Sequence, residues 1–262
     1  MATTNGEVVM GDMDYDGRVI IYIIKADQTS YINYMKPLIL AEELQFPHVL
    51  SVIDTRDEWF YSIHPERYVP SLKDQDPVTK EKVIVFESTA CLQYLTDRFD
   101  TDGFWTGRTA AEKGAILSWT AYQTAALGYA PITTAIIISI IPTTNNGAVP
   151  RPSTGFTSRK GIPLGLIQLN SPVQLRSELH ANTIRQWDIL EKRLKEPGQD
   201  YIALKDRPTV ADLSYFPFAM PWMFSFFGVD VKDWPHIQRW GERMLSRPAI
   251  KRVLERAPTL GH

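Results

Sequence analysis

The chain has 262 residues, of which 44% are hydrophobic and 11% aromatic, and this composition suits a packed core of one large domain or two small ones. A net charge of -2 gives no electrostatic reason to expect a nucleic acid or an anionic membrane as a partner. One cysteine excludes an internal disulfide and fits a reducing compartment, so we expect a cytoplasmic protein.

The first part of the chain predicts a domain in which strands and helices alternate. Residues 1–17 are polar and acidic and lack the apolar segment of a signal peptide, so we expect a flexible tail there. The β-branched run 18–24 predicts a buried strand, and residues 48–54 predict a second one. Between them, residues 33–46 combine an apolar face with exposed glutamates, which predicts a helix.

A turn, a strand and a helix complete this first domain, which we place at residues 18–100. Residues 83–86 predict a short apolar strand and residues 88–99 a helix, and one more strand fits within residues 70–74. The helix has an apolar stripe formed by Cys91, Leu92, Leu95 and Phe99. We therefore expect Cys91 to be a buried, unreactive thiol.

The second part, residues 110–262, is expected to be helical and to follow a linker rich in glycine and threonine at residues 101–109. Residues 110–127 and 175–195 each predict one long helix.

Between these two helices, residues 132–174 form an unusually long connection that contains several prolines and two Gly-containing turns. Its aliphatic runs at 136–141 and 164–169 argue against complete disorder. Long connections in compact domains are usually functional or disordered. Two interpretations remain open, namely a remodelled pocket for one bulky apolar metabolite and a simple surface insertion.

Two short segments contain residue types that suit the binding of a zwitterionic group. Val69-Pro70 is an X-Pro pair; a cis bond at such a pair is uncommon and usually marks a required backbone shape. Glu87-Ser88 lies at the start of the predicted helix, where a serine can bind an anion beside exposed N–H groups and a glutamate can pair with an ammonium. The alternative is an ordinary strand-turn-strand-helix in which Ser88 is only the N-cap.

The segments 68–72 and 85–95 resemble the peptide-binding half of cytosolic glutathione transferases. The helical half strengthens the resemblance through the segment 201–212, whose Thr209 and Asp212 have capping-box spacing, and through Pro-x-x-x-x-Trp and Arg-Pro-Ala motifs at 235–240 and 247–249. The resemblance spans residues 19 to 254. It implies a thioredoxin-like α/β domain followed by an all-α domain, a homodimer, and glutathione as co-substrate.

The family also implies how glutathione is held. The backbone of Val69, before a cis Pro70, is expected to pair with the cysteinyl unit, and Glu87 with Ser88 to bind the γ-glutamyl end. The donor to the sulfur is expected near the start of the first helix. Asn33 and Lys36 form an Asn-x-x-Lys pattern similar to the fungal nitrogen-regulator-like (Nu-like) branch, in which an Asn or Thr contacts the sulfur.

Several assignments stay open because the sequence departs from the family pattern. The loop before Asn33 is longer than usual, so Ser30 and Tyr31 compete for the sulfur, and Asn33 is alternatively a plain helix N-cap. The segment 64–68 lacks the basic residue expected just before Val69.

Arg56 and Arg67 are therefore candidates for the glycine carboxylate of glutathione, with exposed salt-bridging arginines as the alternative. Trp119 and Tyr122 lie on the helix that faces the substrate cleft in relatives, and core packing is the alternative for both. The five histidines show no metal-ligand spacing, so we expect no metal.

The resemblance implies a glutathione transferase that adds the thiolate to a small apolar electrophile, such as an enone, an epoxide or a polyene of fungal secondary metabolism. If the addition reverses after bond rotation, the net reaction is the cis–trans isomerisation of an alkene. The alternative is a non-catalytic regulatory or protein-binding module on the same fold.

Overall fold

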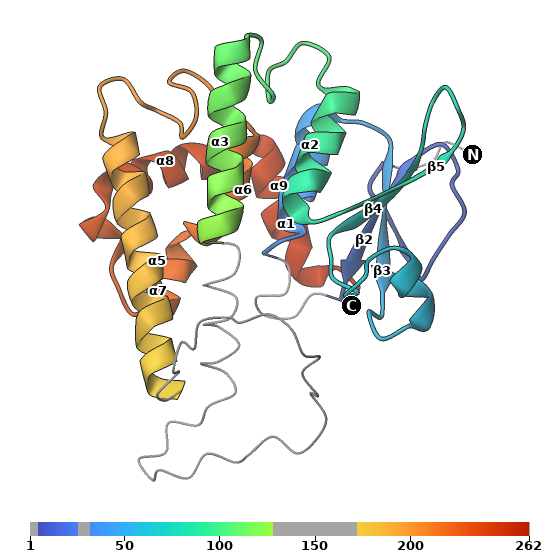
Figure 1. Ribbon diagram of the computed structural model, residues 1–262, viewed down its shortest axis with the longest axis horizontal. Coiled ribbons are helices and arrows are strands. Elements are labelled where there is room, and N and C mark those ends of the chain that lie inside the picture. Colours follow the sequence, from blue (N-terminus) through green and yellow to red (C-terminus); the bar gives the residue numbers. More distant parts are fainter. Residues whose placement is uncertain (1–4, 26–31, 128–171, 262) are drawn as a thin grey trace, which may run out of the picture.

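The computed structural model describes residues 5–25, 32–127 and 172–261 (Figure 1). Within them, five strands form one mixed sheet in the order β1-β3-β2-β4-β5. The strands are β1 Glu7–Met10, β2 Val19–Ile24, β3 His48–Ile53, β4 Ser71–Gln75 and β5 Lys82–Phe86. β2 runs parallel to β3 and antiparallel to β4, and β4 pairs antiparallel with β5.

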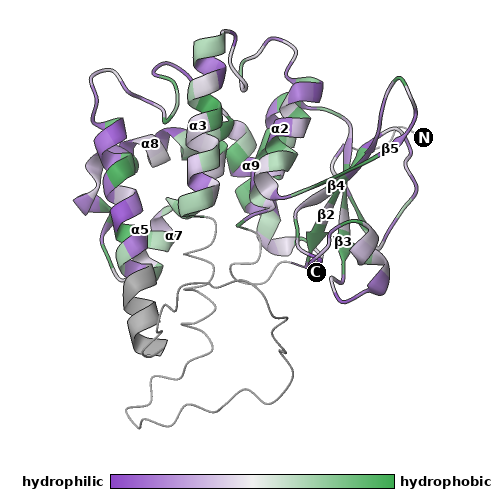
Figure 2. Cartoon of the chain, in the orientation of Figure 1, coloured by the Kyte–Doolittle hydropathy of each residue, from purple (hydrophilic) through white to green (hydrophobic). Residues whose placement is uncertain are grey.

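The central strands follow directly from their sequences. β2 and β3 are buried along nearly their whole length and appear as hydrophobic ribbons in Figure 2. Parallel strands that are covered on both faces need such continuous apolar runs. The additional strand expected within residues 70–74 is confirmed as β4.

The prediction of a flexible tail at residues 1–17 is wrong for its described part, residues 5–17. β1 extends the sheet by pairing in parallel with β3. The acidic residues that suggested a solvated tail have basic partners, because Glu7 lies 2.9 Å from the Arg18 guanidinium and Asp12 lies 3.1 Å from Lys73 Nζ. Pairing of β1 with the edge of β3, together with these ion pairs, holds the segment against the domain.

Two helices cover one face of the sheet, α1 Met35–Leu44 and α2 Ser88–Phe99. The other face is covered by the 3-10 helix η1 Glu58–Ser62, whose Phe60 packs edge-on against Tyr22 at 5.6 Å between ring centroids. The predicted helices at residues 33–46 and 88–99 are thereby confirmed, the first two residues shorter at each end.

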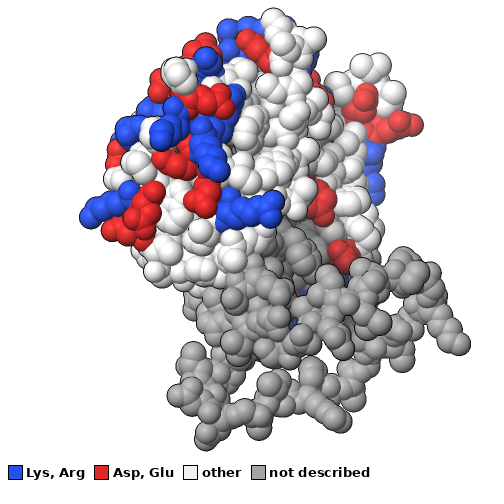
Figure 3. Space-filling view, turned by 60° about the vertical axis from the view of Figure 1, so that its left-hand side comes forward, with Lys and Arg blue, Asp and Glu red and all other residues white. Residues whose placement is uncertain are grey.

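The remainder is helical, and the long helices predicted at 110–127 and 175–195 are confirmed as α3 and α5. The α-helices are α3 Ala110–Ala126, α5 Pro172–Leu194, α6 Val210–Tyr215, α7 Pro221–Phe226, α8 Pro235–Ser246 and α9 Pro248–Arg256, with 3-10 turns η2 Phe216–Phe218, η3 Val231–Asp233 and η4 Ala257–Thr259. No helix in the described ranges is long and apolar enough to cross a membrane. The side of α5 and α8 carries charges of both signs close together (Figure 3).

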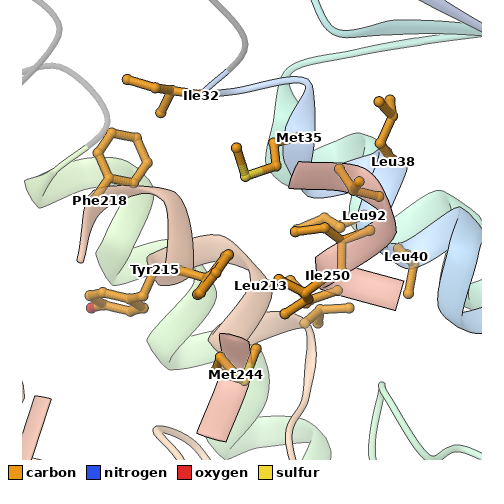
Figure 4. Close-up of a cluster of buried hydrophobic side chains, with 14 of the residues drawn as sticks. Ile32, Met35, Leu38, Leu40, Leu92, Leu213, Tyr215, Phe218, Met244 and Ile250 are labelled. Atoms are coloured by element: carbon orange, nitrogen blue, oxygen red, sulfur yellow. The ribbon is translucent and has the colours of Figure 1, made fainter. Parts of the chain in front are cut away.

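The two halves share one hydrophobic core. In Figure 4, Met35 of α1, Leu92, Leu213 of α6 and Ile250 lie together in one cluster. At the rim, the Arg247 guanidinium donates to both oxygens of the Glu43 carboxylate at 2.6 and 2.9 Å. Because α1, α2, α3 and α6 meet here, residues from both halves can reach one site.

The capping box predicted for Thr209 and Asp212 is confirmed at the start of α6. The buried Asp212 carboxylate also accepts the backbone N–H of Ile202 and the indole N–H of Trp240, both at 2.9 Å. One side chain therefore fixes the start of α6 against α8.

Candidate functional site

The pairing of β4 with β5 brings the two sequence motifs together. The register places Ser71 opposite Phe86, so the start of β4 lies beside the end of β5. Val69-Pro70 immediately precedes β4, and its peptide bond is cis. Glu87 and Ser88 immediately follow β5. Two pairs separated by sixteen residues in sequence are thus neighbours at one corner of the sheet, as the resemblance implies.

The interpretation of Ser88 as a plain N-cap is wrong. The N-cap of α2 is Glu87, whose backbone φ is positive at +73°, and no side-chain hydrogen bond caps the helix. Ser88 is the first helical residue, so its hydroxyl lies beside the first backbone N–H groups of α2. The exposed Glu87 carboxylate lies at the same corner. The corner therefore offers N–H donors for an anion and a carboxylate for a cation.

His64 is part of this corner, and the sequence argument did not assign it a role. Its ring is buried between the aromatic rings of Tyr68 and Phe86, at 5.4 and 4.9 Å between centroids. Nδ1 accepts the backbone N–H of Glu66 at 3.0 Å, so the neutral ring carries its proton on Nε2, which lies 3.7 Å from Glu87 Oε1. Burial lowers the pKa of His64, which favours this neutral form.

Lys36 lies beneath Ser88, and its sequence pattern with Asn33 did not predict this contact. Its side chain is only 2% exposed, although Lys36 is the second residue of α1 and lies close to the end of the helix. Nζ donates to Ser88 Oγ at 3.2 Å and to Gln123 Oε1 at 3.4 Å, and it lies 4.9 Å from the ring centroid of Phe218. Burial lowers the pKa of Lys36 to about 7, with Glu87 and Cys91 acting in the opposite direction.

The helical half supplies the other partners of this ammonium. Gln123 of α3 is fully buried, and its Oε1 also accepts the Ser214 hydroxyl of α6 at 2.9 Å. Its Nε2 has no hydrogen-bond partner within the described part of the chain. The residues that follow Ser88 on α2 and Gln123 on α3 also meet, because the hydroxyls of Thr89 and Thr124 are hydrogen-bonded. The site is therefore built at the junction of the two halves.

Cys91 lies below the cis peptide and is buried, as expected. Its Sγ is 3.8 Å from the carbonyl oxygens of Pro70 and Val85. Burial raises the pKa of the Cys91 thiol far above its ordinary value, so it is neutral at physiological pH.

The candidates for the sulfur are only partly described. Ser30 and Tyr31 lie outside the described residues. Asn33 is half-buried in the turn before α1, and the N-cap of α1 is Tyr34, so the alternative of Asn33 as the N-cap is wrong. Asn33 lies two residues before the first residue of α1, and Lys36 is the second residue of that helix.

The candidate arginines are engaged within their own loop. Arg56 is exposed and forms a bidentate ion pair with Asp54, with the shortest distance 2.5 Å. Arg67 donates to the carbonyl oxygen of Arg56 at 2.9 Å and lies over the ring of Tyr61. These contacts favour the salt-bridge alternative for Arg56, and the role of either arginine toward glutathione stays a prediction.

The two aromatic residues of α3 differ in their surroundings. Trp119 is partly buried, with its ring 6.2 Å from that of Tyr215 and 5.7 Å from the Arg193 guanidinium, which fits core packing. Tyr122 is 38% exposed and meets Trp119 edge-on. Tyr122 is thus the better placed of the two to meet a ligand.

Among the described residues, no group of three or more His, Cys, Asp or Glu side chains could hold a metal ion. The part of the long connection from 132 to 171 lies outside the described residues, so both interpretations of it stay open.

Comparisons with known proteins agree with this architecture. The family model of the glutathione S-transferase C-terminal domain matches residues 159–248. The chain is 72% identical to glutathione S-transferase aclG of Aspergillus oryzae, over 95% of this chain and all of that protein. It is 60% identical to the trimodular acetylaranotin synthesis protein ataIMG of Aspergillus terreus, over 90% of this chain but only 21% of that protein.

A solved structure supports the fold as well. The glutathione transferase homolog of Lodderomyces elongisporus, crystallised with two glutathione molecules per subunit, superposes with a TM-score of 0.68, covering 91% of this chain and 98% of that one. At 20% sequence identity this likeness concerns the fold alone.

Proposed function

The chain belongs to the glutathione S-transferase family, and we propose that it adds the glutathione thiolate to an apolar activated electrophile of fungal secondary metabolism. The observation that carries the glutathione site is the β4–β5 register, which places cis Val69-Pro70 beside Glu87-Ser88. The identity to aclG and to an acetylaranotin synthesis protein supports a dedicated metabolite as the second substrate.

Each part of glutathione has a complementary group at this corner. The backbone of Val69 is suited to pair with the peptide of the cysteinyl unit, as an added strand pairs with a sheet edge. The exposed Glu87 carboxylate is suited to the γ-glutamyl ammonium, and the Ser88 hydroxyl with the N–H groups of α2 to the γ-glutamyl carboxylate. The two charges of the zwitterion are thus matched by a carboxylate and by neutral hydrogen-bond donors on adjacent residues.

The reaction needs the thiolate, and a free thiol with a pKa of about 8.5 is only a few per cent ionised at neutral pH. A hydrogen-bond donor beside the sulfur raises that fraction. Asn33 is the proposed donor, with Ser30 and Tyr31 as competitors, and the spacing of Asn33 and Lys36 supports membership of the nitrogen-regulator-like branch. The sulfur electron pair forms the S–C bond, and the enolate or alkoxide that results takes a proton from water.

Tyr122 and the segment 132–174 are proposed to face the electrophile, since Tyr122 is exposed on the helix next to the glutathione corner. For a conjugated alkene, addition, bond rotation and elimination would return glutathione and give a cis–trans isomerase. The sequence resembles the transferase of the pseurotin pathway, which performs such a reaction. Product analysis separates the two outcomes, because conjugation consumes glutathione and isomerisation does not.

Titration calorimetry with reduced glutathione tests the site. Glu87→Ala and Ser88→Ala should each weaken binding roughly tenfold or more, because each leaves a charged ligand group without its partner. Glu81→Ala and Ser62→Ala are matched controls, since both side chains are exposed and bond only locally. If both site variants keep wild-type affinity, the glutathione site is elsewhere.

We also propose a homodimer in the cytoplasm. Tyr61, Tyr68 and Phe86 are large apolar side chains that are 40–60% exposed on the first domain. Such side chains gathered on one domain favour an interface with a second copy. Sedimentation velocity at micromolar concentration should show twice the monomer mass, and a monomer alone would contradict the proposal.

A further inference from the structure

The buried ammonium of Lys36 is the feature of this site that a simple binding role does not require. It is 2% exposed, and its two acceptors within the described ranges, Ser88 Oγ and Gln123 Oε1, are both uncharged. Burying a cation without a charged partner costs free energy, so the charged form of Lys36 lowers the stability of the ligand-free protein. A ligand anion at the start of α2 would supply the missing charge.

We propose that Lys36 is a positioning residue for the γ-glutamyl carboxylate, acting through the Ser88 hydroxyl, and that binding of the ligand is accompanied by proton uptake at Lys36. This inference rests on the glutathione site proposed above. It adds a group that does not touch the ligand and a proton that the binding reaction must take up.

The hydrogen-bond directions support this role. Lys36 has only donors, so Ser88 must accept from it, and the hydroxyl hydrogen of Ser88 is then available to a ligand carboxylate. From the other side, Gln123 Oε1 accepts from both Lys36 and Ser214, which fixes the orientation of the amide. The helical half thereby holds the ammonium under Ser88.

The charges around Lys36 explain why the proton is gained on binding. From α2 and its N-cap it meets Glu87 and Cys91, from α3 Gln123, from α6 Ser214 through that amide, and from η2 the ring of Phe218. Of these, Glu87 is the only anion at neutral pH, and it is exposed and faces the buried, neutral His64.

Because the pKa of Lys36 is about 7 in the ligand-free protein, a large fraction of its amines is uncharged at pH 8. An anion beside Ser88 raises this pKa, since it stabilises the charged form. Binding above pH 7 therefore takes up a proton, and affinity should fall as the pH rises, by up to about tenfold per pH unit.

Calorimetry of S-methylglutathione at pH 8 in two buffers of different ionisation enthalpy measures this uptake, and the thioether removes titration of the ligand thiol. The wild type should take up more protons than Lys36→Met, by about half a proton or more. The difference cancels any titration of the ligand amine. Lys113→Met, which removes an exposed lysine of α3, should match the wild type.

A second variant tests the same point without removing the lysine. Gln123→Glu places a carboxylate at the position of Oε1, so Lys36 is charged before the ligand arrives and the additional uptake should disappear. Equal uptake in the wild type, Lys36→Met and Gln123→Glu would overturn the role of Lys36 while leaving the glutathione site intact. A wild type that binds no S-methylglutathione between pH 6 and 9 would overturn both proposals.

Discussion

The ligand-free protein should become more stable as the pH rises above 7, and Lys36 should be the cause. Burial lowers the pKa of Lys36 from 10.5 to about 7. Between these two values the unfolded chain holds a proton that the folded chain has lost, so the free energy of unfolding increases with pH. Below pH 7 both states hold the proton, and Lys36 contributes no slope. Over pH 6 to 8.5 the gain is about 2 kcal/mol, at roughly 1.4 kcal/mol per pH unit.

Urea unfolding of the wild type and Lys36→Met at pH 6 and pH 8.5 measures the effect. The difference between the two proteins isolates Lys36, because other groups contribute equally to both. The range ends at pH 8.5 since Cys91, whose pKa burial raises, acts in the opposite direction above about pH 9. Lys113→Met should follow the wild type. A gap between wild type and Lys36→Met that is the same at both pH values would refute the argument.

Three further predictions, which use five substitutions, separate structural from functional roles. Asp212→Ala leaves buried backbone and indole N–H groups without an acceptor, so it should lower the free energy of unfolding by roughly 3 kcal/mol or more. The control Asp230→Ala, at an exposed 3-10 turn, should lower it by less than about 2 kcal/mol. Urea unfolding measures both. Trp119→Ala should lower the free energy of unfolding by about 3–5 kcal/mol, while Tyr122→Ala should leave it nearly unchanged. Tyr122→Ala should instead raise KM for a bulky apolar electrophile more than for a small one. If KM rises more for the small electrophile, the bulky one binds elsewhere. Asn33→Ala should lower kcat roughly tenfold to a hundredfold with glutathione affinity nearly intact, and an unchanged thiol pKa, followed by thiolate absorbance, would transfer the role to Ser30 or Tyr31.

Most of the fold could be predicted because its elements are specified locally. The buried strands β2 and β3, the helix α2 and the capping box of α6 each have a pattern that is complete within a short window. β1 was missed because it is only four residues long, is mostly exposed and lies within a polar, acidic segment. Its strand conformation depends on the edge of β3 and on ion pairs with Arg18 and Lys73, and neither partner is visible in the segment itself.

The candidate site likewise has residues that the sequence predicts and residues that it does not. Val69-Pro70 and Glu87-Ser88 were recognisable because each pair is contiguous and has an unusual composition. The contact of Lys36 with Gln123 joins residues 87 positions apart, and a lysine in an amphipathic helix normally predicts a solvated side chain. His64 was missed for a related reason. Its burial depends on the rings of Tyr68, which precedes β4, and Phe86, which ends β5, and neither contact is visible in the sequence around His64.

The path from Lys36 to Gln123 also bears on how the two substrates are coupled. Gln123 and Tyr122 are consecutive residues of α3, so their side chains lie about 100° apart around the helix, and one is buried against the ammonium while the other is exposed. The helix that is proposed to meet the electrophile therefore also carries the acceptor that holds Lys36 under Ser88. A rotation or shift of α3 in response to the electrophile would change the distance from Gln123 Oε1 to Lys36 Nζ, and with it the charge beneath the glutathione carboxylate. On the proposed role of Lys36, the helical half contributes to the affinity for glutathione as well as to the choice of the second substrate.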